Sequence, residues 1–213
     1  MIPDRREVTS VVSPRPWDAR LAYVLVLPLK DTRVSPNALT SLRLVAGLGA
    51  AWAFASRSPN LGAWLFALSN FLDHTDGELA RITGKGSRFG HYYDLACDAV
   101  VTVLLFFSIG MGLSHGELGM WALPMGIVAG AAVAAIFHLR NAMETRLGRT
   151  ATQQPSIAGF EAEDVLYLLP LVALFNGLPP FLIAATVFAP LGAVLVLQQS
   201  RRQLRSLGAE NRL

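Results

Sequence analysis

Long apolar stretches alternate with short polar ones along most of this chain. A transmembrane helix needs about 20 mostly apolar residues, and six segments approach that pattern. They are residues 38–56, a stretch that begins with the apolar run 61–72, and residues 92–113, 119–138, 157–175 and 179–198. The pattern therefore predicts an all-α integral membrane protein with six transmembrane helices.

Three of these segments, the second, third and fifth, are apolar in one half and acidic in the other. A carboxylate in hydrocarbon is unfavourable, so acids inside a membrane helix usually carry function. The connections at residues 58–60, 114–116 and 176–179 are short and rich in Gly, Pro, Ser and Asn, which is typical of turns between helices.

Composition supports a membrane protein. Hydrophobic residues make up 53% of the 213 residues and charged residues only 15%, against about 25% charged in an ordinary soluble domain. The single cysteine, Cys97, excludes an intrachain disulfide framework and a zinc site with several cysteines.

The basic residues indicate the orientation. With six spans, all but two of the 18 Lys and Arg residues fall on the face that carries both termini. Arg57 lies on the opposite face and Arg43 lies within the first span, whereas a five-span arrangement would scatter the charges over both faces. Positive residues are retained in the cytoplasm, so we expect a multi-pass protein of the cytoplasmic membrane with cytoplasmic termini.

Three regions are expected along the chain. Residues 1–34 form a cytoplasmic arm, 35–200 the six-helix domain and 201–213 a basic cytoplasmic tail. Within the arm, residues 17–29 (WDARLAYVLVLPL) are too short to span and predict an amphipathic helix that lies in the membrane interface. A signal peptide is the alternative, although Asp31 and Arg33 stand where small residues would precede a cleavage site.

An acidic pattern dominates residues 73–98. One stripe at helical spacing contains Asp73, Asp76, Gly77 and Ala80, and a second contains Gly90, Asp94 and Asp98. The Gly84-Lys85-Gly86-Ser87 turn joins the two helices, which we expect to be antiparallel neighbours. Two pairs of carboxylates then face one another near the cytoplasmic boundary of the membrane.

Four clustered carboxylates need countercharge. Ligands that are only oxygen atoms favour a hard cation, so the cluster predicts Mg²⁺ or Mn²⁺, with two ions expected for four acids. Because Mg²⁺ is often bound jointly by carboxylates and substrate phosphates, a diphosphate is the expected ligand. Gly77, Ala80 and Gly90 leave room for a nucleotide, and Arg81 could reach a phosphate. A lone Asp is usually a helix cap, which does not explain four acids in two registers.

The pattern Asp73-x-x-Asp76-Gly77-x-x-Ala80-Arg81, followed after eight residues by Gly90-x-x-x-Asp94-x-x-x-Asp98, resembles the signature of the CDP-alcohol phosphotransferases, also called CDP-alcohol phosphatidyltransferases. The resemblance covers roughly residues 17–202. It implies an α-helical membrane enzyme, usually a homodimer, whose metal site opens to the cytoplasm. By this resemblance Asp73, Asp76 and Asp94 bind metal, Asp98 completes the cluster and acts as general base, and Asp73, Gly77, Ala80, Arg81 and Gly90 line the CDP site.

The implied reaction transfers a substituted phosphate group from a CDP-alcohol to the hydroxyl of an acceptor alcohol and releases CMP, in phospholipid biosynthesis. CDP-diacylglycerol is the expected donor, and a CDP-linked headgroup such as CDP-inositol or a CDP-amino alcohol is the alternative. The expected partners are the donor, the acceptor and membrane lipid, with no nucleic acid. A divalent-cation transporter is a distant alternative, because transporter sites tend to lie near the bilayer midplane.

Several residues outside the signature have two interpretations. Arg140, Arg146 and Arg149 could bind a phosphorylated acceptor or simply reflect the cytoplasmic excess of positive charge. Glu78 is either a mark of the inositol-phosphate branch of the family or a solvent-facing acid that pairs with Lys85 or Arg88. For Arg43 we expect either an ion pair with an acid or a side chain that extends to the interface.

Overall fold

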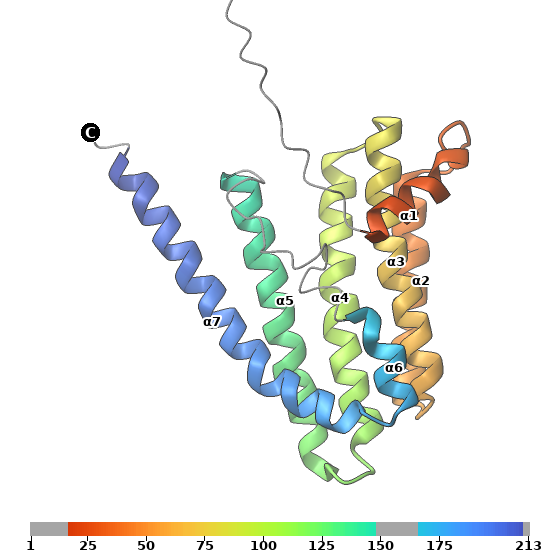
Figure 1. The fold of residues 1–213 in the computed structure, drawn as a ribbon, viewed down its shortest axis with the longest axis vertical. Helices are drawn as coiled ribbons and strands as arrows, with labels where there is room; N and C mark the ends of the chain where they lie inside the picture. The colour runs from red at the N-terminus through yellow and green to blue at the C-terminus, as the bar shows by residue number, and fades with distance from the viewer. Residues whose placement is uncertain (1–16, 148–165, 211–213) are drawn as a thin grey trace, which may run out of the picture.

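The computed structural model describes residues 17–147 and 166–210, and every regular element within these ranges is a helix (Figure 1). The all-α prediction is therefore confirmed for the described chain. The elements are α1 (Trp17–Val26), the 3₁₀ turn η1 (Leu27–Leu29), α2 (Pro36–Ala55), α3 (Pro59–Thr83), α4 (Arg88–Leu113), the 3₁₀ turn η2 (Gly119–Trp121), α5 (Ala122–Leu147), α6 (Leu169–Leu174) and α7 (Leu178–Glu210).

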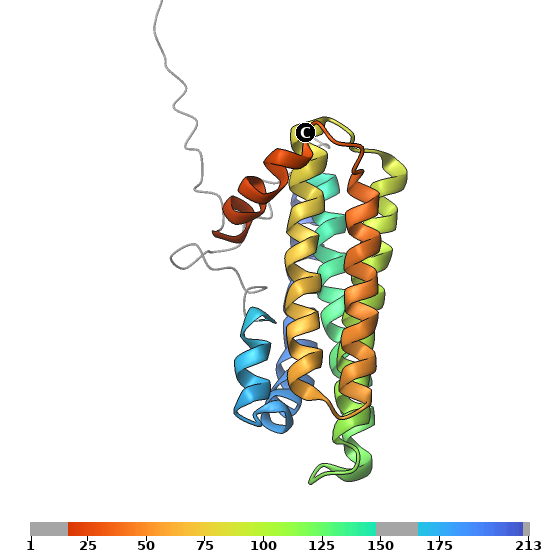
Figure 2. The same cartoon turned by 90° about the vertical axis from the view of Figure 1, so that its right-hand side faces the viewer.

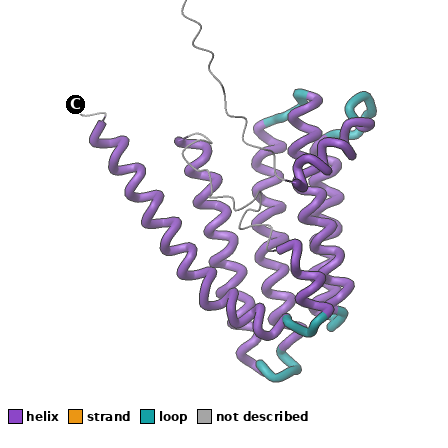
Figure 3. The backbone as a smooth tube through the Cα atoms, in the orientation of Figure 1, coloured by secondary structure: helices purple, strands orange, loops and turns teal. Residues whose placement is uncertain are grey.

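Helices α2 to α5 run side by side as a bundle (Figures 1 and 2). Helix α2 packs along both α3 and α4, α5 packs along α4, and α7 crosses α5 and diverges from it toward the C-terminus. The short helices α1 and α6 both pack against α3, near opposite ends of it (Figure 2). The connecting loops gather at the two ends of the bundle, as Figure 3 shows.

Local sequence signals explain where the key helices begin and end. Ser35 caps α2, its hydroxyl accepting from the Ala38 amide at 3.2 Å, and Pro36 occupies the first turn, where its missing N–H is harmless. Helix α3 ends at Gly84, which adopts the left-handed conformation with φ 65°. Ser87 then caps α4 by accepting from the Gly90 amide at 2.9 Å. The predicted turn between the acidic helices is thus confirmed.

Within the described residues, four helices are long and apolar enough to cross a membrane: Pro36–Ala55, Arg88–Leu113, Gly119–Met143 and Leu178–Arg202. They coincide with the first, third, fourth and sixth predicted spans. The second predicted span belongs to α3, which is one continuous helix of 25 residues and therefore about 37 Å long. Helix α3 is long enough to span, but it is too polar to be counted among the four candidate spans. Its last turns carry Asp73, Asp76, Glu78 and Arg81.

The remaining topological predictions are tested less directly. Most of the predicted fifth span, residues 157–175, lies outside the described residues, and α6 is the helix within its described part. A helix does form at Trp17–Val26, inside the segment predicted to lie in the membrane interface. Helix α7 continues past residue 200, where the tail was expected to begin. The six-span arrangement, the interfacial position of α1 and the three-region division stay predictions.

Close helix contacts depend on small residues and a buried apolar core. A side chain at Gly126 of α5 would place its Cβ 2.3 Å from the Phe106 carbonyl oxygen of α4, so only glycine permits this approach. Around the contact, buried residues of several helices form one cluster that includes Leu105, Phe106, Ile109, Leu169 and Leu182. This packing fixes α4, and hence its acids, relative to the rest of the bundle.

Candidate metal centre

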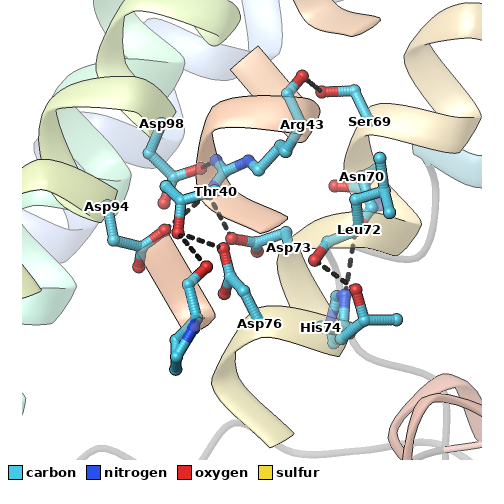
Figure 4. A network of polar contacts seen from close by, with 12 residues as sticks. Thr40, Arg43, Ser69, Asn70, Leu72, Asp73, His74, Asp76, Asp94 and Asp98 are labelled. Carbon is cyan, nitrogen blue, oxygen red and sulfur yellow. Dashed lines mark hydrogen bonds and ion pairs between the residues drawn. The ribbon is translucent and has the colours of Figure 1, made fainter. Parts of the chain in front are cut away.

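The four acids of the sequence pattern lie in the half of the bundle where α2 begins, α3 ends and α4 begins. Figure 4 shows them grouped around Thr40 and Arg43. Asp73 and Asp76 come from α3, and Asp94 and Asp98 come from α4. The structure differs from the expected arrangement in one respect. The two acidic helices do not pack along one another as α2 packs along each of them, so α2 forms the third wall of the site.

Three of the acids come together as a ligand set. Oxygen atoms of Asp73, Asp76 and Asp94 lie within 4.8 Å of one another, one from each carboxylate. Asp76 is buried and the other two are partly buried. Three convergent carboxylates fit a hard divalent cation such as Mg²⁺ or Mn²⁺, whose preferred ligands are oxygen atoms.

Arg43 of α2 pairs with acids of both neighbouring helices. Its Nη1 donates to Asp73 and, at 2.7 Å, to Oδ1 of Asp94, while its Nη2 donates to Asp98. The Arg43 side chain is only 3% exposed. Of the two expectations for this residue, the ion pair is confirmed, and the guanidinium reaches three acids in place of one.

Thr40, one turn before Arg43, contacts the remaining acid. Its hydroxyl lies 2.6 Å from Oδ2 of Asp76 and 3.2 Å from the Pro36 carbonyl oxygen. Because a carboxylate accepts, the hydroxyl donates to Asp76. Thr40 is 3% exposed, so it is a buried positioning group that sequence reasoning missed. The available signal was its spacing of three from Arg43, which puts both residues on one helix face.

The small residues of the signature differ in their surroundings. A Cβ at Gly77 would meet no atom within 4 Å, so this position faces open space beside the acids. Ala80 is partly buried on the same helix. At Gly90 a Cβ would lie 2.8 Å from Oδ1 of Asn37, so a larger residue there would have to displace this side chain from the first turn of α2.

Arg81 and Glu78 form an ion pair on α3. Nη1 of Arg81 donates to Oε1 of Glu78 at 2.6 Å, with the arginine side chain 55% exposed and the glutamate side chain 2% exposed. The interpretation of Glu78 as a solvent-facing acid is therefore wrong, and its partner is Arg81 in place of Lys85 or Arg88. An exposed guanidinium anchored by a buried acid remains open to a phosphate on its other face.

The predicted acceptor-phosphate arginines are only partly described. Arg140 and Arg146 both lie on α5, but the structure describes only the backbone of Arg146. Arg149 lies outside the described residues. Their role stays a prediction. Nearer the acids, His74 Nδ1 lies 3.1 Å from the Asn70 carbonyl oxygen and 3.4 Å from the Tyr167 hydroxyl.

Comparison with known proteins finds related sequences. Residues 33–198 match the family model for CDP-alcohol phosphatidyltransferase, which is well over half of the chain. The chain belongs to the CDP-alcohol phosphatidyltransferase family. The acidic helices α3 and α4, together with α2, lie entirely within the matched range.

Two curated relatives of this chain carry the names of different phospholipid-synthesis enzymes. The archaetidylinositol phosphate synthase of Pyrococcus horikoshii is 35% identical over 84 residues, which cover 39% of this chain and 45% of the relative. The CDP-diacylglycerol–serine O-phosphatidyltransferase of Helicobacter pylori strain J99 is 25% identical over 177 residues, covering 80% of this chain and 70% of the relative. The first match thus spans less than half the length of that relative.

Solved structures of other proteins share the fold. The Mycobacterium tuberculosis phosphatidylinositol phosphate synthase with CDP-DAG bound aligns with a TM-score of 0.58 and 20% identity over 87% of this chain and 92% of that one. The same enzyme in complex with manganese and citrate aligns with a TM-score of 0.58 and 19% identity over 88% of this chain and 87% of that one. At these identities the likeness shows a common fold.

Proposed function

We propose that this protein transfers a substituted phosphate group from a CDP-alcohol, with CDP-diacylglycerol as the donor, to the hydroxyl of an acceptor alcohol, and releases CMP. The observation that carries the proposal is the convergence of Asp73, Asp76 and Asp94 from two helices, beside the open surface at Gly77. Family membership supports the reaction class. CDP-DAG is bound to one structural relative, which supports the choice of donor.

Asp73, Asp76 and Asp94 would hold a Mg²⁺ or Mn²⁺ ion, which when bound neutralises charge on the donor diphosphate. A structural relative of the same fold contains manganese. The pair of ions predicted from four acids stays a prediction, because the structure groups three of the acids as ligands.

Residues of this chain would perform the remaining steps. Arg81, with its guanidinium more than half exposed, would bind a donor phosphate, and Gly77, Ala80 and Gly90 would let the nucleotide approach the helices. Asp98 lies one turn beyond Asp94 and would take the proton of the acceptor hydroxyl. The hydroxyl oxygen then forms the new bond to phosphorus, and the phosphorus–oxygen bond to CMP breaks.

We further propose that the acid-bearing end of the bundle faces the cytoplasm, with six spans in the cytoplasmic membrane. At this end Lys85 lies in the turn between α3 and α4 and Arg88 begins α4, whereas Arg57 lies in the connection between α2 and α3 at the other end. This distribution supports the positive-inside orientation. The homodimer implied by the family resemblance is part of the proposal and can be measured as the mass of the protein in detergent.

The deciding experiment measures CMP release by the purified protein. CDP-diacylglycerol, CDP-inositol and a CDP-amino alcohol are each supplied with a panel of hydroxyl acceptors, in Mg²⁺, in Mn²⁺ and in EDTA. We expect CMP from CDP-diacylglycerol only with metal and an acceptor. Release from a CDP-linked headgroup with a lipid acceptor would reassign the donor. No CMP from any donor, at the level of an Asp76→Asn control, would reject the proposed reaction.

A further inference from the structure

Asp76 is the most deeply buried acid of the ligand set. It is 5% exposed, whereas Asp73 and Asp94 are only partly buried. A buried carboxylate is unfavourable unless hydrogen-bond donors or cations satisfy its oxygen atoms. Among the described residues, Arg43 forms ion pairs with the three other acids of the cluster and not with Asp76. Asp76 therefore depends on a different donor.

Thr40 of α2 supplies that donor. Its hydroxyl lies 2.6 Å from Oδ2 of Asp76, and Figure 4 shows it among the acids. A hydroxyl has one proton to donate, and the other acceptor within reach, the Pro36 carbonyl oxygen, is farther away at 3.2 Å. Within the described chain Thr40 is the one hydrogen-bond donor to Asp76, and Oδ1 of Asp76 accepts no hydrogen bond.

Helix α2 itself sets the direction of this hydroxyl. Threonine is branched at Cβ and stiff at χ1, and in a helix one of its two preferred orientations places the hydroxyl against a carbonyl three or four residues earlier. Thr40 adopts that orientation toward the Pro36 carbonyl. The donor is therefore in place before any ligand binds, with little side-chain freedom left to lose.

A second buried hydrogen bond fixes the register of α2 against α3. The Ser69 hydroxyl of α3 donates to the Arg43 carbonyl oxygen of α2 at 2.9 Å. The two helices approach closely at this level, since a Cβ at Gly47 would lie 3.1 Å from the Ser69 hydroxyl oxygen. Two hydrogen bonds thus join the same pair of helices, and only the one from Thr40 ends on a carboxylate of the ligand set.

We propose that Thr40 is a positioning residue of the reaction. Its hydroxyl holds Oδ2 of Asp76 and thereby presents Oδ1 of the same carboxylate to the divalent cation. Groups that hydrogen-bond to metal ligands orient them in this way in many metal sites. The inference rests on the cation site of the proposed function. Thr40 acts through Asp76 and needs no contact with the cation or with the reacting atoms.

The test is a Mn²⁺ titration of the purified protein, stripped with EDTA and then freed of the chelator, with free ion measured by electron paramagnetic resonance. Thr40→Val keeps nearly the same shape and lacks the hydroxyl. Its Kd for Mn²⁺ should rise about 10–100-fold, the usual effect of removing a group that orients a metal ligand. Thr40→Ser keeps the hydroxyl and should bind Mn²⁺ nearly as tightly as the unmodified protein.

Ser69→Ala is the matched control, because it removes the other hydrogen bond between α2 and α3. It should lower the unfolding temperature, as loss of a buried hydrogen bond does, and leave the Mn²⁺ affinity nearly unchanged. If Thr40 served only to hold the two helices together, Ser69→Ala and Thr40→Val would weaken Mn²⁺ binding equally. That result would overturn the inference, and so would an unchanged Mn²⁺ affinity in Thr40→Val.

A smaller substitution keeps the test decisive if Thr40→Val does not fold. Thr40→Ala avoids an apolar methyl group against the Asp76 carboxylate, and it should bind Mn²⁺ at least about tenfold more weakly than Thr40→Ser. Equal affinities of the Ala and Ser variants would overturn the inference. Absence of Mn²⁺ binding by the unmodified protein would instead reject the cation site of the proposed function.

Discussion

At the scale of single residues, Asp98 differs from the other acids of the cluster in its surroundings. Its side chain is 37% exposed, the largest fraction among the three acids that pair with Arg43. One oxygen accepts from Arg43 and the other has no hydrogen-bond partner in the described chain. An oriented, accessible carboxylate oxygen beside a cation site is suited to accept a proton.

Replacing Asp98 by Asn tests that role. The amide cannot accept a proton, so turnover should fall by roughly 10²–10⁴-fold, the usual contribution of general acid–base catalysis. Mn²⁺ affinity should change much less, because Asp73, Asp76 and Asp94 remain. Cys97→Ala, at the buried neighbouring position, serves as the control and should be nearly silent. A loss of Mn²⁺ affinity as large as in Asp76→Asn would assign Asp98 to metal ligation.

Glu78 supports a second prediction at this scale. In Glu78→Gln the buried side chain keeps its shape but loses the charge that orients Arg81, so Arg81 should spend less time facing the donor phosphate. A charge-assisted hydrogen bond is worth about 1 kcal/mol more than a neutral one, so KM for the CDP donor should rise roughly fivefold with kcat little changed. Lys85→Gln, on the exposed turn, should leave KM unaltered. An equal rise in both variants would exclude a specific role for Glu78.

Helical spacing predicted which acids share a face, because that face follows from the geometry of one helix. Thr40 could not be assigned in the same way, since its contact with Asp76 depends on how α2 packs against α3. Glu78 was misjudged for a related reason. The exposure of a position on α3 depends on α1, α2 and α6, all of which contact that helix and none of which is visible in its own pattern.

At the scale of helices, the site depends on α2 lying between two helices that are consecutive in the chain. The sequence correctly predicted the turn between α3 and α4, because Gly84 and Ser87 are local signals. The sequence did not predict that α2 would pack along both α3 and α4. That packing depends on small residues that let helices approach closely at positions far apart in the sequence. The same kind of contact joins α4 to α5 at Gly126.

A matched pair of glycine substitutions tests the importance of such contacts. Gly126→Ala forces a Cβ against the Phe106 carbonyl and should destabilise the protein by about 1–3 kcal/mol, as overpacking does. Gly49→Ala, whose Cβ would lie 3.5 Å from a Leu65 methyl group, should be neutral or stabilising by up to about 1 kcal/mol. Unfolding can be followed by a thiol-reactive dye, since the one cysteine, Cys97, is buried. Equal stability of the two variants would contradict this prediction.

At the scale of the whole molecule, polar chemistry is concentrated at one end of the bundle. The start of α2, the turn between α3 and α4 and the ends of α5 and α7 all lie at the end that carries the acids (Figure 1). The opposite end consists of the short connections after α2, α4 and α6. Charge counting anticipated this separation, whereas hydropathy alone did not establish α3 as a span.

Cysteine labelling of intact cells tests the orientation. In a Cys97→Ala background, single cysteines at Ser58 and Ser114 should react with an impermeant reagent from outside. A cysteine at Ser87 should react only after the membrane is permeabilised, because the acid-bearing end is expected to face the cytoplasm. Labelling of position 87 in intact cells would reverse the proposed orientation.

The chain order of the ion-paired helices has a consequence for synthesis at the ribosome. Arg43 emerges with α2, before Asp73 on α3 and Asp98 on α4 exist to pair with it. An arginine within an inserting helix opposes insertion, by about 2.5–3.5 kcal/mol at the helix centre. Transfer of α2 into the lipid is therefore less unfavourable once α3 has been synthesised and Asp73 can pair with Arg43. We expect α2 and α3 to leave the translocon together, as a helical hairpin. A chain truncated after α2 should insert poorly, and Arg43→Leu should restore its insertion.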